Sequence, residues 1–363
     1  MVTLLGFACI ILNVGLLELV DPDLVGPAQS WAAYSYALGV WAYSTMDNID
    51  GKQARRTGTS SGLGELFDHG IDSLNCTLAS LLEASAMGLG STKMGAFTAL
   101  VPCLPMFFST WETYHTHTLY LGYFNGPTEG LLIASLIMAA SGFWGASMWK
   151  EPIAKLFGFE SLLGKTNFLD LWVPIILVAF FTAHLPSCVV NVARSRRERD
   201  LPWTPLLLEW TPMVLFVGSL VAWLGSPYTH ILTDNHVCLL CLTLSFVFGR
   251  MTTKIILAHL TRQPFPYWTS LLAPLAGGAV LAWLPMLGLP AVSANVELIY
   301  LWAYFVLSVV VYFRWAVLVV NAICNYLGIN CLTIPEEKWK ALEREKRGEP
   351  VLGVDPTKGK RGD

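Results

Sequence analysis

Charged side chains are scarce in this chain of 363 residues: Asp, Glu, Lys and Arg make up only 13% of it, whereas 54% of the residues are hydrophobic. Soluble domains carry about 25% charged residues, so the deficit argues against an ordinary soluble enzyme. The net charge of −3 says little about partners, and nothing in the sequence indicates nucleic acid. Apolar runs of about 20 residues indicate membrane-spanning helices. The sequence therefore predicts an all-α, polytopic membrane helix bundle.

Several other features are absent. The first apolar stretch, "VTLLGFACIILNVGLLELV", has no basic segment before it and no small-residue cleavage site after it, so we interpret it as a span rather than a signal peptide. No repeat and no soluble domain is recognisable. The eight cysteines imply no disulfide framework. Cys238 and Cys241, with His236 nearby, lack the second ligand pair that a zinc site needs, so we expect them to pack between helices.

Apolar windows predict about ten membrane spans. Their approximate bounds are 3–20, 31–50, 67–89, 94–117, 128–148, 170–192, 205–225, 236–258, 267–288 and 297–325.

The distribution of basic residues predicts the orientation of these spans. Ten spans place both termini on one side. The connections on that side hold "KQARR" (52–56) and "RSRRER" (194–199), whereas the opposite connections hold only isolated lysines. The positive-inside rule then puts both termini and the loop after residue 50 in the cytosol. We expect a transmembrane catalytic domain at 1–332 and a charged cytosolic tail at 333–363.

A cluster of acids interrupts the apolar pattern at the cytosolic end of the second predicted span. Asp47 and Asp50 are three residues apart and share one face of a helix. Gly51 and Ala54 lie beside them, and their small side chains let a ligand or a second backbone come close.

A second acidic pair opens the next helix, after the breaking sequence "TGTSSGLG". Asp68 and Asp72 are four residues apart and again share a face, with Gly64 one turn before them. Two antiparallel helices joined by a short loop would bring both pairs together. Arg55 and Lys52 stand next to the first pair.

Four neighbouring carboxylates need compensation. Two unit charges about 4 Å apart interact by about 4 kcal/mol at an effective dielectric constant near 20, and acids within the membrane are themselves costly. Carboxylate oxygens suit hard divalent cations such as Mg²⁺, which commonly also bind substrate phosphates. Lys52 and Arg55 would then hold phosphate oxygens. The alternative interpretation is a structural salt-bridge cluster at a helix end.

At this point the sequence resembles the CDP-alcohol phosphotransferase family. Every position of that family's signature, D-x2-D-G-x2-A-R-x8-G-x3-D-x3-D, is present from Asp47 to Asp72. The segments "DGKQARRTGTSSGLGELFDHG", "STWETYHTHTLYLG" and "NGPTEG" look like the eukaryotic choline/ethanolamine phosphotransferases, with a fungal-like character. Two departures stand out: relatives have an amphipathic segment before the first span, and many have proline where this chain has Gly62.

The resemblance implies ten spans, a homodimer in the endoplasmic reticulum or Golgi membrane, and an active site facing the cytosol. The implied reaction transfers phosphocholine or phosphoethanolamine from CDP-choline or CDP-ethanolamine to diacylglycerol, giving phosphatidylcholine or phosphatidylethanolamine and CMP. It also implies a site for two Mg²⁺ ions, with Mn²⁺ as the alternative, and a nucleotide pocket. The implied metal ligands are Asp47, Asp50, Asp68 and Asp72, and the implied pocket residues are Gly51, Lys52, Ala54, Arg55 and Gly64.

The acceptor hydroxyl needs a general base, and two residues are candidates. His69 follows Asp68, and its unperturbed pKa near 6.5 suits proton abstraction at neutral pH. In the most similar relatives this histidine is the proposed base, with Glu129 as its partner, whereas the wider family suggests Asp72. We favour His69. From the residues alone, Glu129 is equally well explained as an acid at a helix N-terminus.

Other polar and aromatic residues leave alternatives open. Glu112 and His115 are three residues apart and could imitate a metal pair, but we favour a polar interfacial end with Trp111, Tyr114 and Tyr120 as headgroup-level anchors. Asn75 and Glu83 continue a polar stripe below Asp72, facing either a polar cavity or a neighbouring helix. The aromatic candidates for choline recognition are Trp41, Tyr43 and Tyr114.

Three rival functions remain. A CDP-alcohol phosphotransferase with another head group or acceptor fits the motif, but those acceptors are soluble and their enzymes are shorter. A cation transporter would use intramembrane acids near the bilayer midplane, whereas this cluster is predicted at the cytosolic end. A non-catalytic scaffold gives no reason for the spacing of the acids.

Overall fold

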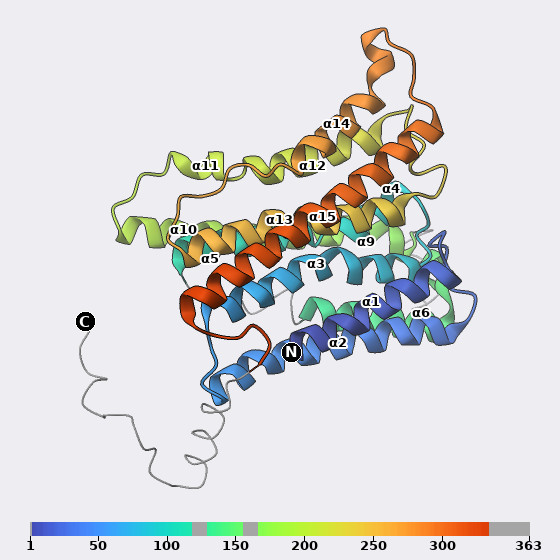
Figure 1. Cartoon of the computed structure of the whole chain (residues 1–363). Coiled ribbons are helices and arrows are strands. Elements are labelled where there is room, and N and C mark those ends of the chain that lie inside the picture. Colours follow the sequence, from blue (N-terminus) through green and yellow to red (C-terminus); the bar gives the residue numbers. More distant parts are fainter. Residues whose placement is uncertain (1, 118–128, 155–165, 334–363) are drawn as a thin grey trace, which may run out of the picture.

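A computed structural model describes residues 2–117, 129–154 and 166–333 of the chain. These residues form helices that run roughly along one direction, and the described part contains no β-sheet (Figure 1). The α-helices are α1 (Val2–Val20), α2 (Ser30–Arg56), α3 (Gly62–Ala86), α4 (Lys93–Leu100), α5 (Cys103–Thr116), α6 (Leu131–Trp144), α9 (Phe168–Ala179), α10 (Leu185–Glu198), α11 (Pro205–Glu209), α12 (Thr211–Gly225), α13 (Val237–Leu260), α14 (Leu272–Ala282) and α15 (Ala294–Leu327). Short helical turns are η2 (Ala146–Lys150), η3 (Phe180–His184) and η4 (Leu284–Leu287).

Five helical stretches among the described residues are long and apolar enough to cross a membrane. Three further apolar helices, α6, α12 and α14, are shorter, and α2 and α3 are long but polar at one end. Each of the ten predicted windows contains a helix, and the all-α membrane class is confirmed. The protein is therefore an integral membrane protein, and ten crossings stay a prediction. The five long stretches are Val2–Val20, Lys93–Thr116, Phe168–Glu198, Val237–Leu260 and Ala294–Leu327.

Helices α2 and α3 form an antiparallel hairpin with a tight turn. The backbone N–H of Thr57 donates to Gln53 O at 2.9 Å, and Gly58 adopts a left-handed conformation with φ of +59°, which ends α2. Ser61 then caps α3, because its hydroxyl accepts a hydrogen bond from the N–H of Gly64 at 3.2 Å. The turn residues therefore fix where the two helices start and stop. The end of the bundle that contains this turn, at the left of Figure 1, is called the hairpin end below.

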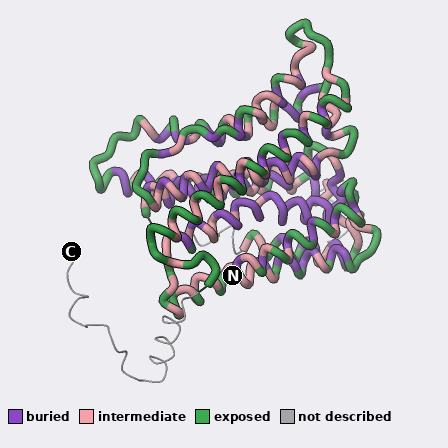
Figure 2. Tube along the Cα trace, viewed as in Figure 1, coloured by how far each residue is buried: buried purple, intermediate pink, exposed green. Residues whose placement is uncertain are grey.

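The third helix lies at the centre of the bundle and is buried along most of its length (Figure 2). It packs closely on α13: a Cβ at Gly249 of α13 would lie only 2.9 Å from the side chain of Leu74. At the far end, Asp21 after α1 accepts a hydrogen bond from Ser85 of α3 at 2.5 Å. Buried side chains thus hold α3 from both sides.

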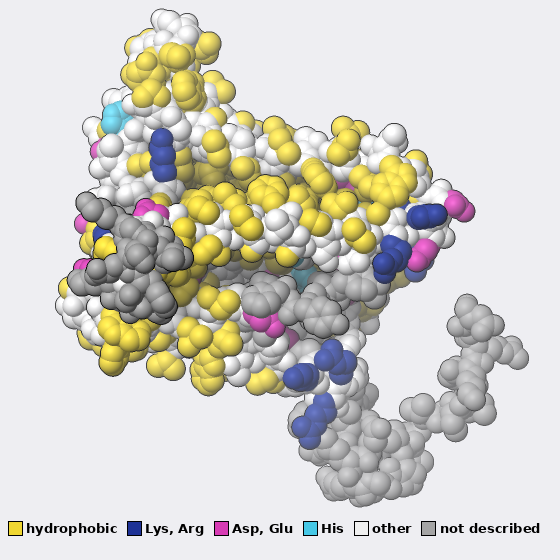
Figure 3. Space-filling model, turned by 180° about the vertical axis from the view of Figure 1, so that it is seen from behind, with side chains coloured by type: hydrophobic (Ala, Val, Ile, Leu, Met, Phe, Trp, Pro, Cys, Tyr) yellow, Lys and Arg dark blue, Asp and Glu magenta, His cyan; other side chains and the backbone are white. Residues whose placement is uncertain are grey.

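The surface divides by chemistry along the bundle. Hydrophobic side chains cover the flank seen in Figure 3, and most of the Lys and Arg side chains visible on that face lie toward the hairpin end. This pattern suits a flank in contact with lipid and an end in contact with water. Inside the bundle, Cys238 and Cys241 are buried in the core as free thiols, so the prediction that they pack between helices is confirmed.

Candidate active site

Three acids from two helices meet at the hairpin end. Asp47 and Asp50 of α2 and Asp68 of α3 each place one carboxylate oxygen within 4.8 Å of the others. All three side chains are half-buried. In the part of the chain that the structure describes, no other group of His, Cys, Asp and Glu meets this criterion for a metal site. The hairpin thus brings Asp68 of the second acidic pair to the first pair, as the helix spacing predicts, whereas Asp72 is not part of this group.

Hydroxyl groups from outside the signature orient two of the acids. The phenol of Tyr43 donates to Asp72 Oδ1 at 2.5 Å, and Tyr43 is almost fully buried. The hydroxyl of Thr3 in α1 donates to Asp50 Oδ2 at 2.5 Å. Hydrogen bonds of this kind fix the direction of a carboxylate, as outer partners of metal ligands commonly do.

The arrangement is unfavourable without a counter-charge. Two ionised carboxylates 4.8 Å apart, the upper limit within this group, repel by about 3.5 kcal/mol at an effective dielectric constant of 20. Moreover, Oδ1 of Asp47 and Oδ1 of Asp68 are both buried and have no hydrogen-bond partner among the residues that the structure describes. Converging carboxylate oxygens that lack donors fit a hard divalent cation. The residues present therefore fit the metal that the acidic spacing indicates.

Basic and small residues continue from this cluster toward the hairpin turn. Lys52 and Arg55 are exposed on the last turns of α2, and a Cβ at Gly51 would lie 3.5 Å from Arg55 Nη1. Ala54 is half-buried on the same helix, and Gly64 is exposed in the first turn of α3. Positive charge and little side-chain bulk thus lie beside the acids, which suits a phosphate-bearing ligand.

His69 is held by its own helix. Its Nδ1 lies 3.0 Å from the carbonyl oxygen of Glu65, which can only accept a hydrogen bond, so Nδ1 carries the proton in this geometry. In a neutral imidazole the other nitrogen, Nε2, is then the atom able to accept a proton. Glu129 is half-buried immediately before α6. Its pairing with His69 stays a prediction.

A series of side-chain contacts that the sequence did not predict starts at Glu65. Glu65 Oε1 lies 3.7 Å from Nε2 of His259 at the end of α13, and His259 Nδ1 lies 3.0 Å from Nδ1 of His117. The rings of His117 and His259 are stacked at 4.9 Å. The sequence offers no signal for this contact because it joins three separate helices.

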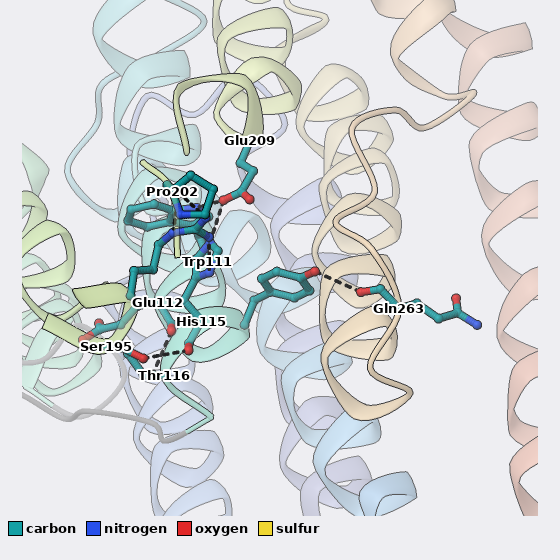
Figure 4. A network of polar contacts seen from close by, with 10 residues as sticks. Trp111, Glu112, His115, Thr116, Ser195, Pro202, Glu209 and Gln263 are labelled. Carbon is teal, nitrogen blue, oxygen red and sulfur yellow. Dashed lines mark hydrogen bonds and ion pairs between the residues drawn. The ribbon is translucent and has the colours of Figure 1, made fainter. Parts of the chain in front are cut away.

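The interpretation of Glu112 and His115 as a metal pair is wrong, and so is that of Trp111 as an interfacial anchor. Glu112 and His115 turn to different partners. His115 Nε2 lies 2.6 Å from Glu209 (Figure 4), whereas Asn191 donates to Glu112 at 2.6 Å. They therefore form no metal pair. Trp111 is buried, and its Nε1 donates to Glu209 at 2.7 Å, so it is not an interfacial anchor. The reason is that α10 and α11 cover this face of α5. Tyr120 lies outside the described residues.

Figure 4 shows this buried network, in which Glu209 of α11 accepts from two side chains of α5. Arg196 of α10 lies 3.4 Å from His115 Nδ1 and also donates to the carbonyl of Pro202. Ser195 donates to the carbonyl of His115 at 3.0 Å. The network ties α5, α10 and α11 together at the hairpin end.

The remaining polar and aromatic candidates lie in different surroundings. Of the three aromatic residues, Tyr43 contacts a site residue, Trp41 is exposed on α2, and the hydroxyl of Tyr114 donates to Gln263 O at 2.9 Å. Asn75 and Glu83 are buried within α3. The polar stripe below Asp72 therefore faces the interior of the bundle.

Comparison with known proteins gives the family. The family model described as "CDP-alcohol phosphatidyltransferase" matches residues 1–155. Choline/ethanolaminephosphotransferase 1 of Arabidopsis thaliana is 32% identical over 93% of this chain and 87% of its own length. Choline/ethanolaminephosphotransferase 1 of Saccharomyces cerevisiae is 31% identical over 93% of this chain and 87% of its own length. Cholinephosphotransferase 1 of the same yeast is 36% identical over 73% and 69%. With its acid cluster at the end of a membrane helix bundle and this similarity along most of its length, the chain belongs to the CDP-alcohol phosphatidyltransferase family.

Proposed function

We propose that this protein transfers phosphocholine or phosphoethanolamine from CDP-choline or CDP-ethanolamine to diacylglycerol, with release of CMP. The observation that carries the proposal is the cluster of Asp47, Asp50 and Asp68, in a chain similar over most of its length to proteins named for this chemistry. The membrane setting supports a lipid acceptor, because the acyl chains of diacylglycerol stay in the leaflet while its hydroxyl group reaches the polar end of the bundle.

The four aspartates of the signature would hold the metal, and two Mg²⁺ ions, or Mn²⁺ in their place, suit the number of carboxylates. A divalent cation bound there supplies positive charge that neutralises the donor diphosphate and the CMP leaving group. Tyr43 and Thr3 fix the directions of Asp72 and Asp50. Two of the four ligands thus keep their geometry before the substrate arrives.

Residues at the start of the hairpin turn would bind the nucleotide donor. Lys52 and Arg55 are exposed donors that can reach phosphate oxygens. The small residues Gly51, Ala54 and Gly64 would line the pocket and let the cytidine approach the backbone of both helices.

His69 is the proposed base. The Glu65 carbonyl holds Nδ1, so Nε2 takes the proton of the acceptor hydroxyl. The hydroxyl oxygen forms a bond to the phosphorus that carries the choline or ethanolamine group. The bond from that phosphorus to the bridging oxygen breaks, and CMP leaves with both electrons and that oxygen. Asp72 is the alternative base, and Glu129 the proposed partner of His69.

The orientation of the chain in the membrane is also part of the proposal. Basic side chains gathered at the hairpin end support a cytosolic active site (Figure 3). We propose one catalytic membrane domain at 1–332 and a cytosolic tail at 333–363, of which residues 334–363 lie outside the described part of the chain. A homodimer in the endoplasmic reticulum or Golgi membrane completes the proposal.

A cation transporter is the rival from another class. Transporters bind ions near the bilayer midplane between broken helices. Here the acids lie on the turns next to the α2–α3 hairpin turn, beside exposed Lys52 and Arg55. This position favours chemistry on a phosphate-bearing substrate over transport.

The test is release of CMP by the purified chain from CDP-choline and from CDP-ethanolamine, side by side, with diacylglycerol and Mg²⁺. We expect release with at least one donor, and loss of release after chelation of the metal. Asp68→Asn should abolish release while the protein stays folded. Near-normal release by folded Asp68→Asn protein would exclude the metal-site proposal.

A further inference from the structure

Two histidines from separate helices share one contact at the hairpin end. His117 directly follows α5, and His259 lies in the last turn of α13. Their Nδ1 atoms are 3.0 Å apart, and their rings stack with centres 4.9 Å apart and an angle of 27° between the planes. Two nitrogens at this distance need one hydrogen atom between them, because two bare nitrogens repel each other and two N–H groups collide. This histidine pair is therefore compatible with only some protonation states.

Glu65 of α3 determines which nitrogen of His259 carries a proton. Its Oε1 lies 3.7 Å from Nε2 of His259, and a carboxylate favours a proton on the nitrogen that faces it. Neutral His259 then has a bare Nδ1, so His117 supplies the hydrogen atom between the rings. One additional proton, on Nε2 of the exposed His117, leaves that hydrogen bond intact. A second, on His259 Nδ1, sets two N–H groups against each other and stacks two cations.

Charged and titratable groups surround the histidine pair on every side that the structure describes. Partial removal from water, followed by the positive charges of His259 and two arginines, lowers the pKa of His117 below its ordinary value of 6.5. A pKa lowered by folding means that the contact is fully formed above pH 6.5 and weakens as the pH falls below that value. The groups that act on the pair are Glu65 and His69 of α3, His115 of α5, Arg199 after α10 and Arg262 after α13.

We propose that the histidine pair is a pH-sensitive switch, which connects the start of α3 to the ends of α5 and α13 at neutral pH and separates when it takes up a second proton. A neighbouring link does not respond in this way: the hydroxyl of Tyr114 donates to Gln263 O at 2.9 Å, and the ordinary pKa of tyrosine is about 10. Separation of the pair is therefore a local opening at the hairpin end and leaves the fold intact.

The switch adjoins the residue proposed as the general base. The carbonyl oxygen of Glu65 lies 3.0 Å from Nδ1 of His69, and the carboxylate of the same Glu65 faces His259. When the histidine pair separates, one of the contacts that hold Glu65 is lost. An effect of the switch on the reaction rests on the proposed function, whereas the switch itself does not.

Hydrogen–deuterium exchange of the purified full chain in detergent, followed by mass spectrometry at pH 7.5 and pH 5.5, measures this opening without any turnover. The informative peptides cover residues 62–70 and 255–262. After correction for the effect of pH on the intrinsic exchange rate, these peptides should exchange about 2- to 10-fold faster at pH 5.5, the factor expected for loss of one hydrogen bond. Failure of the proposed reaction would not affect this result.

Two variants of His117 separate the switch from a merely structural contact. His117→Gln keeps a side chain that can donate and accept without titrating, so its corrected exchange should be slow at both pH values. His117→Phe keeps the ring stack and loses the hydrogen bond, so its exchange should be fast at both. His236→Phe removes a histidine at the opposite end of α13 and should behave as the unmodified chain.

Two results overturn the proposal. One is equal corrected exchange of the unmodified chain at the two pH values. The other is a pH response in His117→Gln as large as that of the unmodified chain. If His117→Phe does not fold, the comparison of the unmodified chain with His117→Gln decides by itself.

Discussion

The hydrogen bond from Tyr43 to Asp72 allows a sharp test of how the site is built. Tyr43→Phe removes the hydroxyl and leaves the ring, which fills a space with only 1% of the residue exposed. A hydrogen bond to a charged group contributes about 1.5–3 kcal/mol. Loss of an outer partner of a metal ligand typically lowers metal affinity by about 10- to 100-fold, which corresponds to about 1.4–2.8 kcal/mol. These two ranges of free energy agree, so we expect Tyr43→Phe to lower the affinity for Mg²⁺ by about 10- to 100-fold.

Thermal unfolding in detergent, with and without Mg²⁺, measures this change apart from activity. At a concentration of 100 times Kd, a bound cation stabilises the folded protein by about 2.7 kcal/mol. The same concentration should contribute only about 0.4–1.4 kcal/mol if Kd rises by about 10- to 100-fold. Tyr36→Phe is the matched control, because Tyr36 is a fully buried tyrosine of the same helix about two turns away. An unchanged Mg²⁺ response in Tyr43→Phe would refute the idea that Tyr43 orients a metal ligand.

Three further changes test other parts of the molecule. Thr3→Val should lower the apparent Mg²⁺ affinity in CMP release by about 10-fold because Asp50 loses its donor, whereas Thr45→Val, which removes only a bond to its own helix, should not. His69→Ala should reduce turnover severely with Mg²⁺ and nucleotide binding retained; unchanged turnover would remove His69 as the base. Glu209→Ala should destabilise the fold by about 3–5 kcal/mol, seen as a lower unfolding temperature, because it breaks a buried pair. The exposed Glu198→Ala is its control, and equal unfolding temperatures would contradict the role assigned to the network.

The hairpin could be predicted because its information is local. Helix periodicity placed Asp47 with Asp50 and Asp68 with Asp72, and the Gly and Ser residues between the helices predicted the turn. The helix face of Tyr43 could also be predicted, since Tyr43 lies one turn before Asp47 on the same face. Its hydrogen bond to Asp72 could not be predicted, because that contact crosses from α2 to α3.

The contacts between distant helices could not be predicted from one sequence. Thr3 reaches Asp50 only because α1 packs beside α2. The pairing of His115 with Glu209 depends on how α11 folds back over α5, and hydropathy does not encode that arrangement. Trp111 is of a residue type common at membrane interfaces, but the packing of these helices buries it.

The tight turn between α2 and α3 has a mechanical consequence. Because one short connection fixes the start of α3 relative to the end of α2, the separation of the two acidic pairs depends mainly on the tilt between these helices. Thr3, Tyr43 and the packing of α3 on α13 restrain that tilt from three directions. If the aspartates hold the proposed cation, any change in that tilt would alter the spacing of its ligands.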